Sequence, residues 1–149
     1  MKNWIYQNEE INEIDIEKYY GFVYCITNNI TGKMYIGKKI LKFKKKLPPL
    51  KGKKRKRIKY VESDWKKYYG SSESLKNDLE EFGEGNFTRE IISLHISKTS
   101  WTYGEVAEQF KRDVLYALLP SGDRAFYNDN ISGRFYPHRD ILNERTTTD

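Results

Sequence analysis

The stretch GFVYCITNNITGKMYIGK, residues 21–38, decides the fold of this chain. Aromatic and β-branched residues alternate along GFVYCITNN, which predicts a strand with two different faces. Residues 28–32, NNITG, supply turn chemistry, because Asn and Gly tolerate positive φ. KMYIGK, residues 33–38, then predicts a second strand. The stretch therefore predicts a β-hairpin.

The segments around the hairpin predict a small α+β fold with helices against a three-stranded mixed or antiparallel sheet. Ser71 or Ser72 caps a helix that runs through Phe82, and residues 86–97 have strand composition. A long helix is expected from Ser100 to just before Pro120, with an apolar stripe of Val106, Phe110, Val114, Ala117 and Leu118. We expect an N-terminal extension over 1–20, one domain over 21–136 and a tail over 137–149.

Composition narrows the class of protein. A chain of 149 residues suits a single domain, and a lone cysteine, Cys25, gives no internal disulfide. No apolar run approaches the ~20 residues that span a bilayer, and no leader opens the chain. We therefore expect a cytoplasmic protein without a membrane partner. Two histidines, His95 and His138, and one cysteine give no zinc site of usual spacing, and both histidines are interpreted as structural.

The positive charge is concentrated in one segment. Residues 38–59 contain 13 Lys or Arg among 22 residues and no acid. The rest of the chain has 14 basic and 21 acidic residues, so its balance is −7 and the whole chain carries +6. Pro48, Pro49 and Gly52 favour a loop, and so dense a cationic loop is typical of contact with a polyanion, nucleic acid first.

Two tyrosines of the hairpin, Tyr24 and Tyr35, are expected on one side of it and close together. The stretch that contains them resembles the signature of the GIY-YIG nucleases. Tyr24 stands at the tyrosine of the first half-motif, Tyr35-Ile36-Gly37 reproduces the second, and the spacing of eleven is the family's. The first half-motif is degenerate, because Phe22-Val23-Tyr24 replaces Gly-Ile-Tyr.

The resemblance extends to about residue 135. DWKKYYGSS, residues 64–72, is similar to a block of the Seg-type phage endonucleases, and Gly83, Asn86-Phe87 and Arg89-Glu90-Ile91 match the same group. Glu105 falls where the family places its acidic metal ligand, and Asn128 where it has a terminal asparagine. Glu105, Gln109, Arg112 and Tyr116 are expected to form a polar stripe on the long helix.

The resemblance implies a DNA endonuclease that leaves 5′-phosphate and 3′-hydroxyl ends, in a phage-type homing or DNA-degrading role. A single carboxylate such as Glu105 can hold one hard cation, Mg²⁺ or Mn²⁺, among waters. Tyr24 or Tyr35 would orient or deprotonate the attacking water. A tyrosine base needs a nearby cation to lower its pKa, and Lys38 and Lys39 are candidates. Asn128 would orient metal-binding or phosphate-binding groups.

The chain departs from the family where a catalytic arginine, often followed by a histidine, is usual. The basic segment occupies that place, so Arg57, Arg55, Lys66 or Lys67 would substitute for the arginine, and Tyr68 for the histidine. Double-stranded DNA is the expected partner, with no small-molecule cofactor, and the oligomeric state is left open, a dimer included. The expected DNA-binding residues are Lys38, Lys45, Lys54, Arg55, Lys56, Lys66 and Lys67.

Two other functions fit parts of the sequence. A non-catalytic DNA-binding or RNA-binding protein would use the basic segment and the aromatic residues, but has no use for Tyr24, Tyr35, Glu105 and Asn128 as a set. A degenerate nuclease kept as a DNA-targeting module would explain the missing arginine. Cleavage of a plasmid in the presence of a divalent ion separates these functions from the enzyme.

Overall fold

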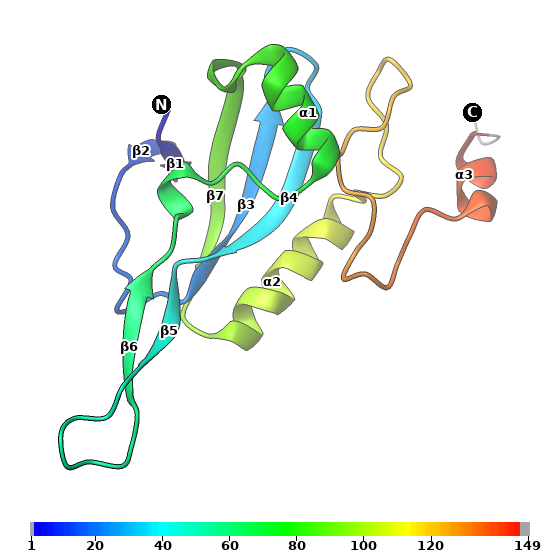
Figure 1. Ribbon diagram of the computed structural model, residues 1–149. Coiled ribbons are helices and arrows are strands. Elements are labelled where there is room, and N and C mark those ends of the chain that lie inside the picture. Colours follow the sequence, from blue (N-terminus) through cyan, green and yellow to red (C-terminus); the bar gives the residue numbers. More distant parts are fainter. Residues whose placement is uncertain (1, 147–149) are drawn as a thin grey trace.

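The predicted hairpin lies at one end of a five-stranded sheet in the computed structural model, which describes residues 2–146 (Figure 1). Strand β3 (Gly21–Asn28) pairs antiparallel with β4 (Met34–Ile40) on one side and with β7 (Phe87–His95) on the other. The turn between β3 and β4 contains Gly32 at φ 84°. The predicted turn chemistry and the α+β class are thus confirmed.

The first residues of the chain add two further strands, so the sheet has five strands where three were expected. Strand β1 (Trp4–Tyr6) pairs parallel with β7, and β2 (Glu9–Ile11) pairs antiparallel with β1. Trp4 is 1% exposed, and its indole Nε1 donates to the Trp65 carbonyl at 2.8 Å. The N-terminal segment therefore packs into the same core as the hairpin.

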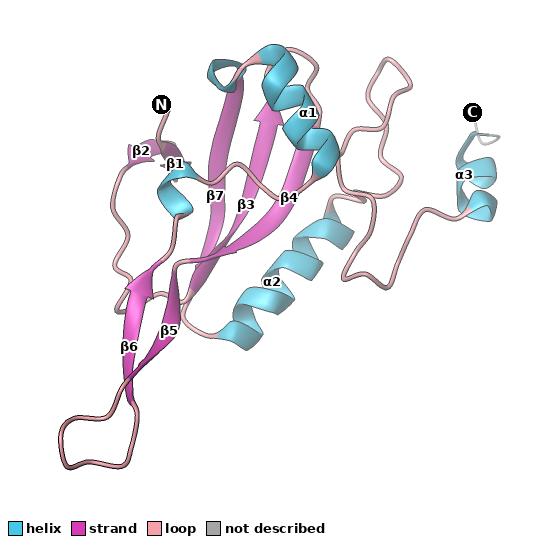
Figure 2. Ribbon diagram, in the orientation of Figure 1, coloured by secondary structure: helices cyan, strands magenta, loops and turns pink. Residues whose placement is uncertain are grey.

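Both faces of the sheet are covered, because the alternation along β3 supplies two cores. Phe22, Tyr24 and Ile26 pack on the side of helix α1 (Glu73–Phe82). Val23 and Cys25 pack on the opposite side, the side of helix α2 (Lys98–Lys111). Figure 2 shows α1 at the upper ends of the strands and α2 beside β4. The free thiol of Cys25 is buried in the second core.

Helix α1 begins and ends at the residues that its sequence predicts. The Ser72 side chain accepts a hydrogen bond from the Leu75 backbone N–H, which satisfies a donor of the first turn. Gly83 ends the helix at φ 84°, a conformation that suits glycine. Leu75 is fully buried, and Leu79 and Phe82 pack partly buried beside it. The predicted apolar face is thus confirmed.

The long helix expected up to Pro120 is wrong in its second half. Helix α2 ends at Lys111, and Asp113 has φ 56°, so the chain turns there. Val114 is buried beyond the helix end, whereas Phe110 and Leu118 are about half exposed. The spacing of apolar residues imitated one helical stripe, although they belong to a short helix and an irregular segment after it.

The basic segment is a β-hairpin and not the expected loop. Strands β5 (Lys42–Leu47) and β6 (Arg57–Glu62) pair antiparallel, and only residues 48–56 form a loop at the tip. We call residues 42–62 the arm. It projects away from the main sheet (Figure 1). Backbone pairing holds it together although Lys45 and Lys59 lie directly opposite each other.

The chain beyond α2 runs along the outer side of β4 before it leaves the sheet. The Met34 N–H donates to the Ala125 carbonyl at 2.9 Å, and the Tyr127 N–H donates to the Met34 carbonyl at 2.8 Å. Helix α3 (Arg139–Thr146) follows within the expected tail, of which residues 147–149 lie outside the described part. In the part of the chain described, none of the helices is long and apolar enough to cross a membrane.

Candidate active site

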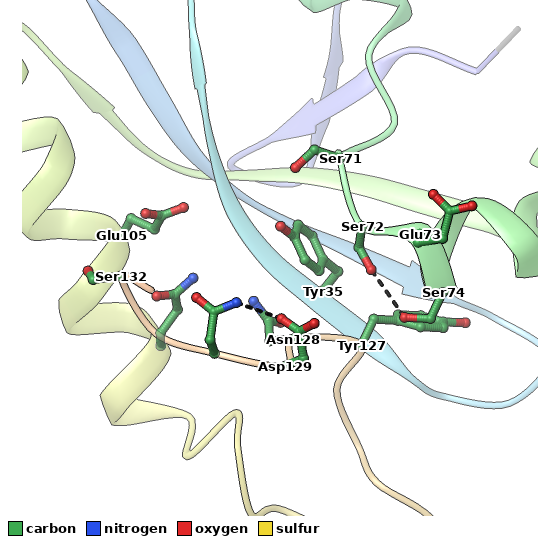
Figure 3. A pocket seen from close by; sticks show the side chains of 12 residues that line it. Tyr35, Ser71, Ser72, Glu73, Ser74, Glu105, Tyr127, Asn128, Asp129 and Ser132 are labelled. Atoms are coloured by element: carbon green, nitrogen blue, oxygen red, sulfur yellow. Dashed lines mark hydrogen bonds between the residues drawn. The ribbon is translucent and has the colours of Figure 1, made fainter. Parts of the chain in front are cut away.

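A cavity of about 390 Å³ opens beside β4, and we call it the site cavity. Three segments that are distant in the sequence form its wall: β4 with Tyr35, the start of α1, and α2 with Glu105 and Gln109. A fourth segment, residues 127–132, completes the wall. Figure 3 shows the Glu105 carboxylate pointing toward the Tyr35 ring across this space.

Tyr35, the tyrosine of the second half-motif, lines the site cavity. Its hydroxyl forms a hydrogen bond with the Ser71 side chain. Burial raises the pKa of Tyr35, the Ser71 hydrogen bond lowers it, and negative charge from Tyr68 and Glu105 adds to the rise. We expected Lys38 or Lys39 to lower this pKa, whereas burial makes the net change a rise. The hydroxyl is therefore protonated near neutral pH.

Tyr24 lies behind Tyr35 and does not line the site cavity. It is 1% exposed, its ring centroid lies 6.1 Å from that of Tyr35, and its hydroxyl hydrogen-bonds with Tyr68. Burial raises the pKa of Tyr24 well above its usual value. Gly37 faces it across the hairpin, and a Cβ at Gly37 would lie 2.5 Å from the Tyr24 hydroxyl oxygen. The two tyrosines are close, as expected, but only one is accessible.

Glu105 extends from α2 to the outer side of β4. Its carboxylate accepts a hydrogen bond from the Lys38 backbone N–H. Burial raises the pKa of Glu105, while the Lys38 ammonium and the same N–H lower it. A partly buried carboxylate held by one backbone donor keeps its remaining lone pairs for another ligand.

Two amides next to Glu105 bond the backbone of β4. Asn128 is buried, accepts from the Ile36 N–H at 3.0 Å and donates to the Ile36 carbonyl at 2.8 Å. Gln109 donates to the same carbonyl at 3.1 Å. The polar stripe expected on the long helix is only partly present, because Arg112 and Tyr116 lie beyond the end of α2 at Lys111. Asn128 therefore positions the strand that carries Tyr35 with both ends of its amide.

The two lysines that follow the second half-motif have different surroundings. The Lys39 ammonium pairs with Asp64 at 2.6 Å and lies 4.0 Å from the centroid of the Tyr68 ring. The Lys38 ammonium donates to Thr102 and acts electrostatically on Glu105. Lys38 is thus the cation next to the Glu105 carboxylate. Lys39 instead pairs with Asp64 beside the Tyr68 ring, which packs against Tyr24.

The arginine candidates lie in the arm and do not line the site cavity. Arg57 stands opposite Leu47 near the arm tip, and its Nε donates to the Pro48 carbonyl at 3.2 Å. Arg55 belongs to the tip loop, with Lys54 and Lys56. Lys66 pairs with Glu13 at 2.8 Å, and Lys67 is exposed beside it. None of these side chains is among those that surround Tyr35 and Glu105.

Other residues near the site were not singled out by the sequence. Glu73 and Asp129 add two carboxylates to the wall of the site cavity. Arg89 is buried between the rings of Trp4 and Tyr69, at 4.6 and 4.2 Å. Its guanidinium donates to the carbonyls of Lys2, Lys66 and Tyr68. It thereby fixes the segment that leads to Ser71, a role that depends on contacts no local pattern reveals.

The donor set of the site cavity suits a hard cation. Within residues 2–146, no three His, Cys, Asp or Glu side chains form a group that could hold a metal ion by themselves. The wall offers oxygen donors, namely the carboxylates of Glu105, Glu73 and Asp129 and nearby hydroxyls. Mg²⁺ prefers this chemistry, with one or two carboxylates, a substrate phosphate and several waters.

Comparison with known proteins agrees with the resemblance of the tyrosine motif. The chain matches a family model described as "Putative endonuclease segE, GIY-YIG domain" over residues 4–131. This range includes the five strands of the main sheet, the arm, α2 and Asn128. Searches of curated proteins and of solved structures found no match.

Proposed function

The chain belongs to the SegE-type GIY-YIG endonuclease family, and on that premise we propose that it hydrolyses phosphodiester bonds of double-stranded DNA. The reaction would require Mg²⁺ or Mn²⁺ and leave 5′-phosphate and 3′-hydroxyl ends, in a homing or DNA-degrading role. One observation carries the proposal: the Tyr35 hydroxyl and the Glu105 carboxylate line a single cavity next to a cation, Lys38.

Glu105 would hold the metal ion in the site cavity. Its carboxylate is fixed by the Lys38 N–H and keeps further lone pairs available, which supports this assignment. Glu73 and Asp129 are the other carboxylates within the same wall. When bound, the ion would neutralise charge on the scissile phosphate and stabilise the leaving oxygen.

Tyr35 would orient the attacking water. Its raised pKa keeps the hydroxyl neutral near pH 7, so it can both donate and accept a hydrogen bond. Ser71, which lowers the pKa of Tyr35, is the hydroxyl partner beside it. Tyr24 and Tyr68 pack behind it edge to face, with ring centroids 5.9 Å apart, and act as positioning residues. Asn128 belongs to the same group, because both ends of its amide bond Ile36.

Lys38 would bind the scissile phosphate in place of the family's arginine. Its ammonium lies 4.3 Å from the centroid of the Trp101 ring and next to the Glu105 carboxylate, so it is held at the rim of the cavity. Lysine neutralises a phosphate as a point charge and lacks the two-pronged fork of arginine. Arg57 and Arg55 would instead contact DNA through the arm.

The arm would supply most of the affinity for duplex DNA. Between residues 42 and 61 it carries 11 Lys or Arg and no acid, so contact with phosphates would be largely independent of sequence and sensitive to salt. Lys45, Lys54, Arg55 and Lys56 belong to this surface. Lys66 and Lys67 add two exposed ammonium groups after the arm, next to the segment that leads into the site cavity.

Plasmid nicking with single substitutions tests the catalytic assignment. Glu105→Gln keeps the shape of the side chain but removes its charge, so we expect nicking with Mg²⁺ or Mn²⁺ to fall at least about 10²-fold. Tyr35→Phe should lower the rate by about 10²- to 10⁴-fold. Both variants should bind a labelled duplex like the parent protein. Glu108→Gln, which removes the carboxylate that pairs with Arg112 just beyond the end of α2, is the matched control.

The outcomes separate the enzyme from a binding protein. Full activity of Glu105→Gln would remove Glu105 from the metal site, and full activity of Tyr35→Phe would remove that hydroxyl from the reaction. A parent protein that binds duplex DNA but nicks nothing with any divalent ion would be a non-catalytic DNA-binding protein or a degenerate nuclease.

A further inference from the structure

A second cavity, of about 620 Å³, lies where the arm joins the main sheet. We call it the arm-root cavity. It is formed by Tyr60 and Lys44 of the arm, Tyr20 before β3, and Ile96 and Lys98 at the start of α2. It shares no lining residue with the site cavity. Nothing in the proposed cleavage reaction uses it.

The chemistry of its wall is both apolar and cationic. Tyr60 and Ile96 are 54% and 69% exposed. Neither packs into one of the two hydrophobic cores, so packing does not explain why these positions carry large apolar side chains. Three lysines, Lys42, Lys44 and Lys98, surround them, and no acidic residue lines the cavity. A flat apolar group attached to an anionic backbone suits such a wall, and a nucleotide of a DNA strand has this composition.

The register of the arm extends the same surface outward. Lys44 pairs with Tyr60 and Lys46 with Ile58, and paired residues share a face of the ribbon. Lys42 lies on that face too, with its ammonium 5.2 Å from the centroid of the Tyr60 ring. A track of Lys42, Lys44 and Lys46 therefore leads from the arm-root cavity along one face of the arm, and Glu62, opposite Lys42 at its root, is the acidic residue on the strands of that face.

The two cavities lie within reach of one bound nucleic acid. Lys98 and Glu105 are seven residues apart on α2, which is roughly 10 Å along the axis. Tyr35 and Ile40 are five residues apart on β4, roughly 17 Å. At 3.4 Å per step of a strand, these separations correspond to about three to five nucleotides.

We propose that the arm-root cavity binds an unpaired nucleobase of the DNA strand about three to five nucleotides from the bond in the site cavity. The base stacks on Tyr60, and the flanking phosphates contact Lys44 and Lys98. This inference rests on the proposed function for the identity of the ligand. It adds to that function a preference for DNA with a base free to leave the helix, because stacking requires an unpaired base.

Binding of a labelled thymidine oligonucleotide tests the cavity without cleavage. The measurement uses the full chain with Glu105→Gln, by fluorescence anisotropy and without divalent ions. Adding Tyr60→Ala should weaken binding by about 5- to 150-fold, the usual effect of removing one stacking ring. Tyr60→Ala should leave the slope of log K against log salt concentration unchanged, since no charge is lost. Lys44→Gln should lower that slope by about 0.7.

Ile58→Ala is the matched control, because Ile58 lies on the same face of β6, is 57% exposed and does not line the cavity. It should bind like the parent. Equal losses for Tyr60→Ala and Ile58→Ala would overturn the proposal. An acidic peptide that competes for the cavity with the same dependence on Tyr60 would also overturn it, in favour of a protein ligand.

Duplex substrates complete the test. A duplex with one unpaired base should bind the Glu105→Gln chain more tightly than a fully paired one, and Tyr60→Ala should abolish that difference. A persistent difference would overturn the proposal. Failure of the proposed function appears separately, as absence of nicking by the parent chain, because none of these binding measurements requires cleavage.

Discussion

Gly37 shows how closely a single residue controls the site. A Cβ there would meet the Tyr24 hydroxyl oxygen at 2.5 Å and the Tyr35 ring at 2.9 Å, so any side chain at this position must displace one of these rings. Gly37→Ala should lower the free energy of unfolding by about 1–3 kcal/mol, as for other overpacked cores.

Urea denaturation checks this value, and Tyr24→Phe supplies the control. The phenylalanine removes the atom that Gly37→Ala would strike first, so the alanine should cost less in that background. An equal cost in both backgrounds would show that the Tyr24 hydroxyl is not the obstacle.

His95 gives the fold a dependence on pH. Its two ring nitrogens lie 2.7 and 2.6 Å from the hydroxyls of Ser93 and Ser100, and burial lowers the pKa of His95 below 6.5. The unfolded chain therefore binds a proton more readily, so stability is lost as pH falls below about 6.5. We expect the melting temperature of His95→Gln to change less than that of the parent between pH 7 and pH 5. Parallel curves for both proteins would contradict this.

The arm is the element in which charge can be removed with the least effect on the fold. Its tip loop packs against no core, so Lys54, Arg55 and Lys56 can be changed to Gln together without loss of stability. Each phosphate contact contributes about 0.9 to the slope of log K against log salt, so the triple variant should lose up to about 2.7. Titration of a labelled duplex at several salt concentrations measures this.

Lys18→Gln is the control for the arm, because Lys18 is exposed but belongs to the acidic N-terminal segment. It should leave the slope unchanged. The affinity lost by the triple variant should be the same for unrelated duplex sequences, and a loss confined to one sequence would mean that the arm reads bases.

Elements defined by near neighbours could be predicted from the sequence. The hairpin follows from alternation and its turn residues, and α1 from the Ser72 cap and Gly83. The strands of the arm could not, because lysine runs with two prolines indicate a loop until cross-strand pairing is known. The end of α2 could not be predicted either. The chain turns at Asp113, but the helical spacing of apolar residues continues past this turn.

The family motif singled out two residues of the candidate site that lie close together in the fold. Tyr35 and Glu105 share a cavity, although 70 residues separate them in the sequence. The motif did not reveal that Tyr24 is buried or that Arg57 lies near the arm tip, since both depend on how distant segments pack. The sequence placed Arg89 in a matching strand but did not reveal its role, because its hydrogen-bond partners, the carbonyls of Lys2, Lys66 and Tyr68, lie far from it in the sequence.

The whole molecule depends on its N-terminal strand. Trp4 contacts the rings of Phe22 and Tyr24 edge to face, at 4.9 and 5.4 Å, and packs under Arg89. Trp4→Ala should therefore cost about 3–5 kcal/mol of unfolding free energy. Nicking should also fall at temperatures where the variant is still folded, because Trp4 packs against the ring of Tyr24, which lies directly behind Tyr35.

Thermal unfolding and nicking rates at low temperature distinguish these effects. Ile5→Ala serves as the control, since it lies on the same short strand but is only partly buried. If Trp4→Ala and Ile5→Ala lose the same stability, the N-terminal strand is an accessory of the sheet and not part of its core.

The outward backbone of β4 has a consequence beyond cleavage. An open strand at the rim of a sheet invites pairing with another copy of the same chain, and proteins must cover such rims. Here the segment around Phe126 covers the start of β4 by backbone pairing at Met34, and Asn128, Gln109 and Glu105, which belong to the proposed active site, cover the residues that follow. Variants that remove these amides should form oligomers through β4 while their helices remain intact. On the proposed function, selection against self-association and selection for activity would therefore act on the same residues.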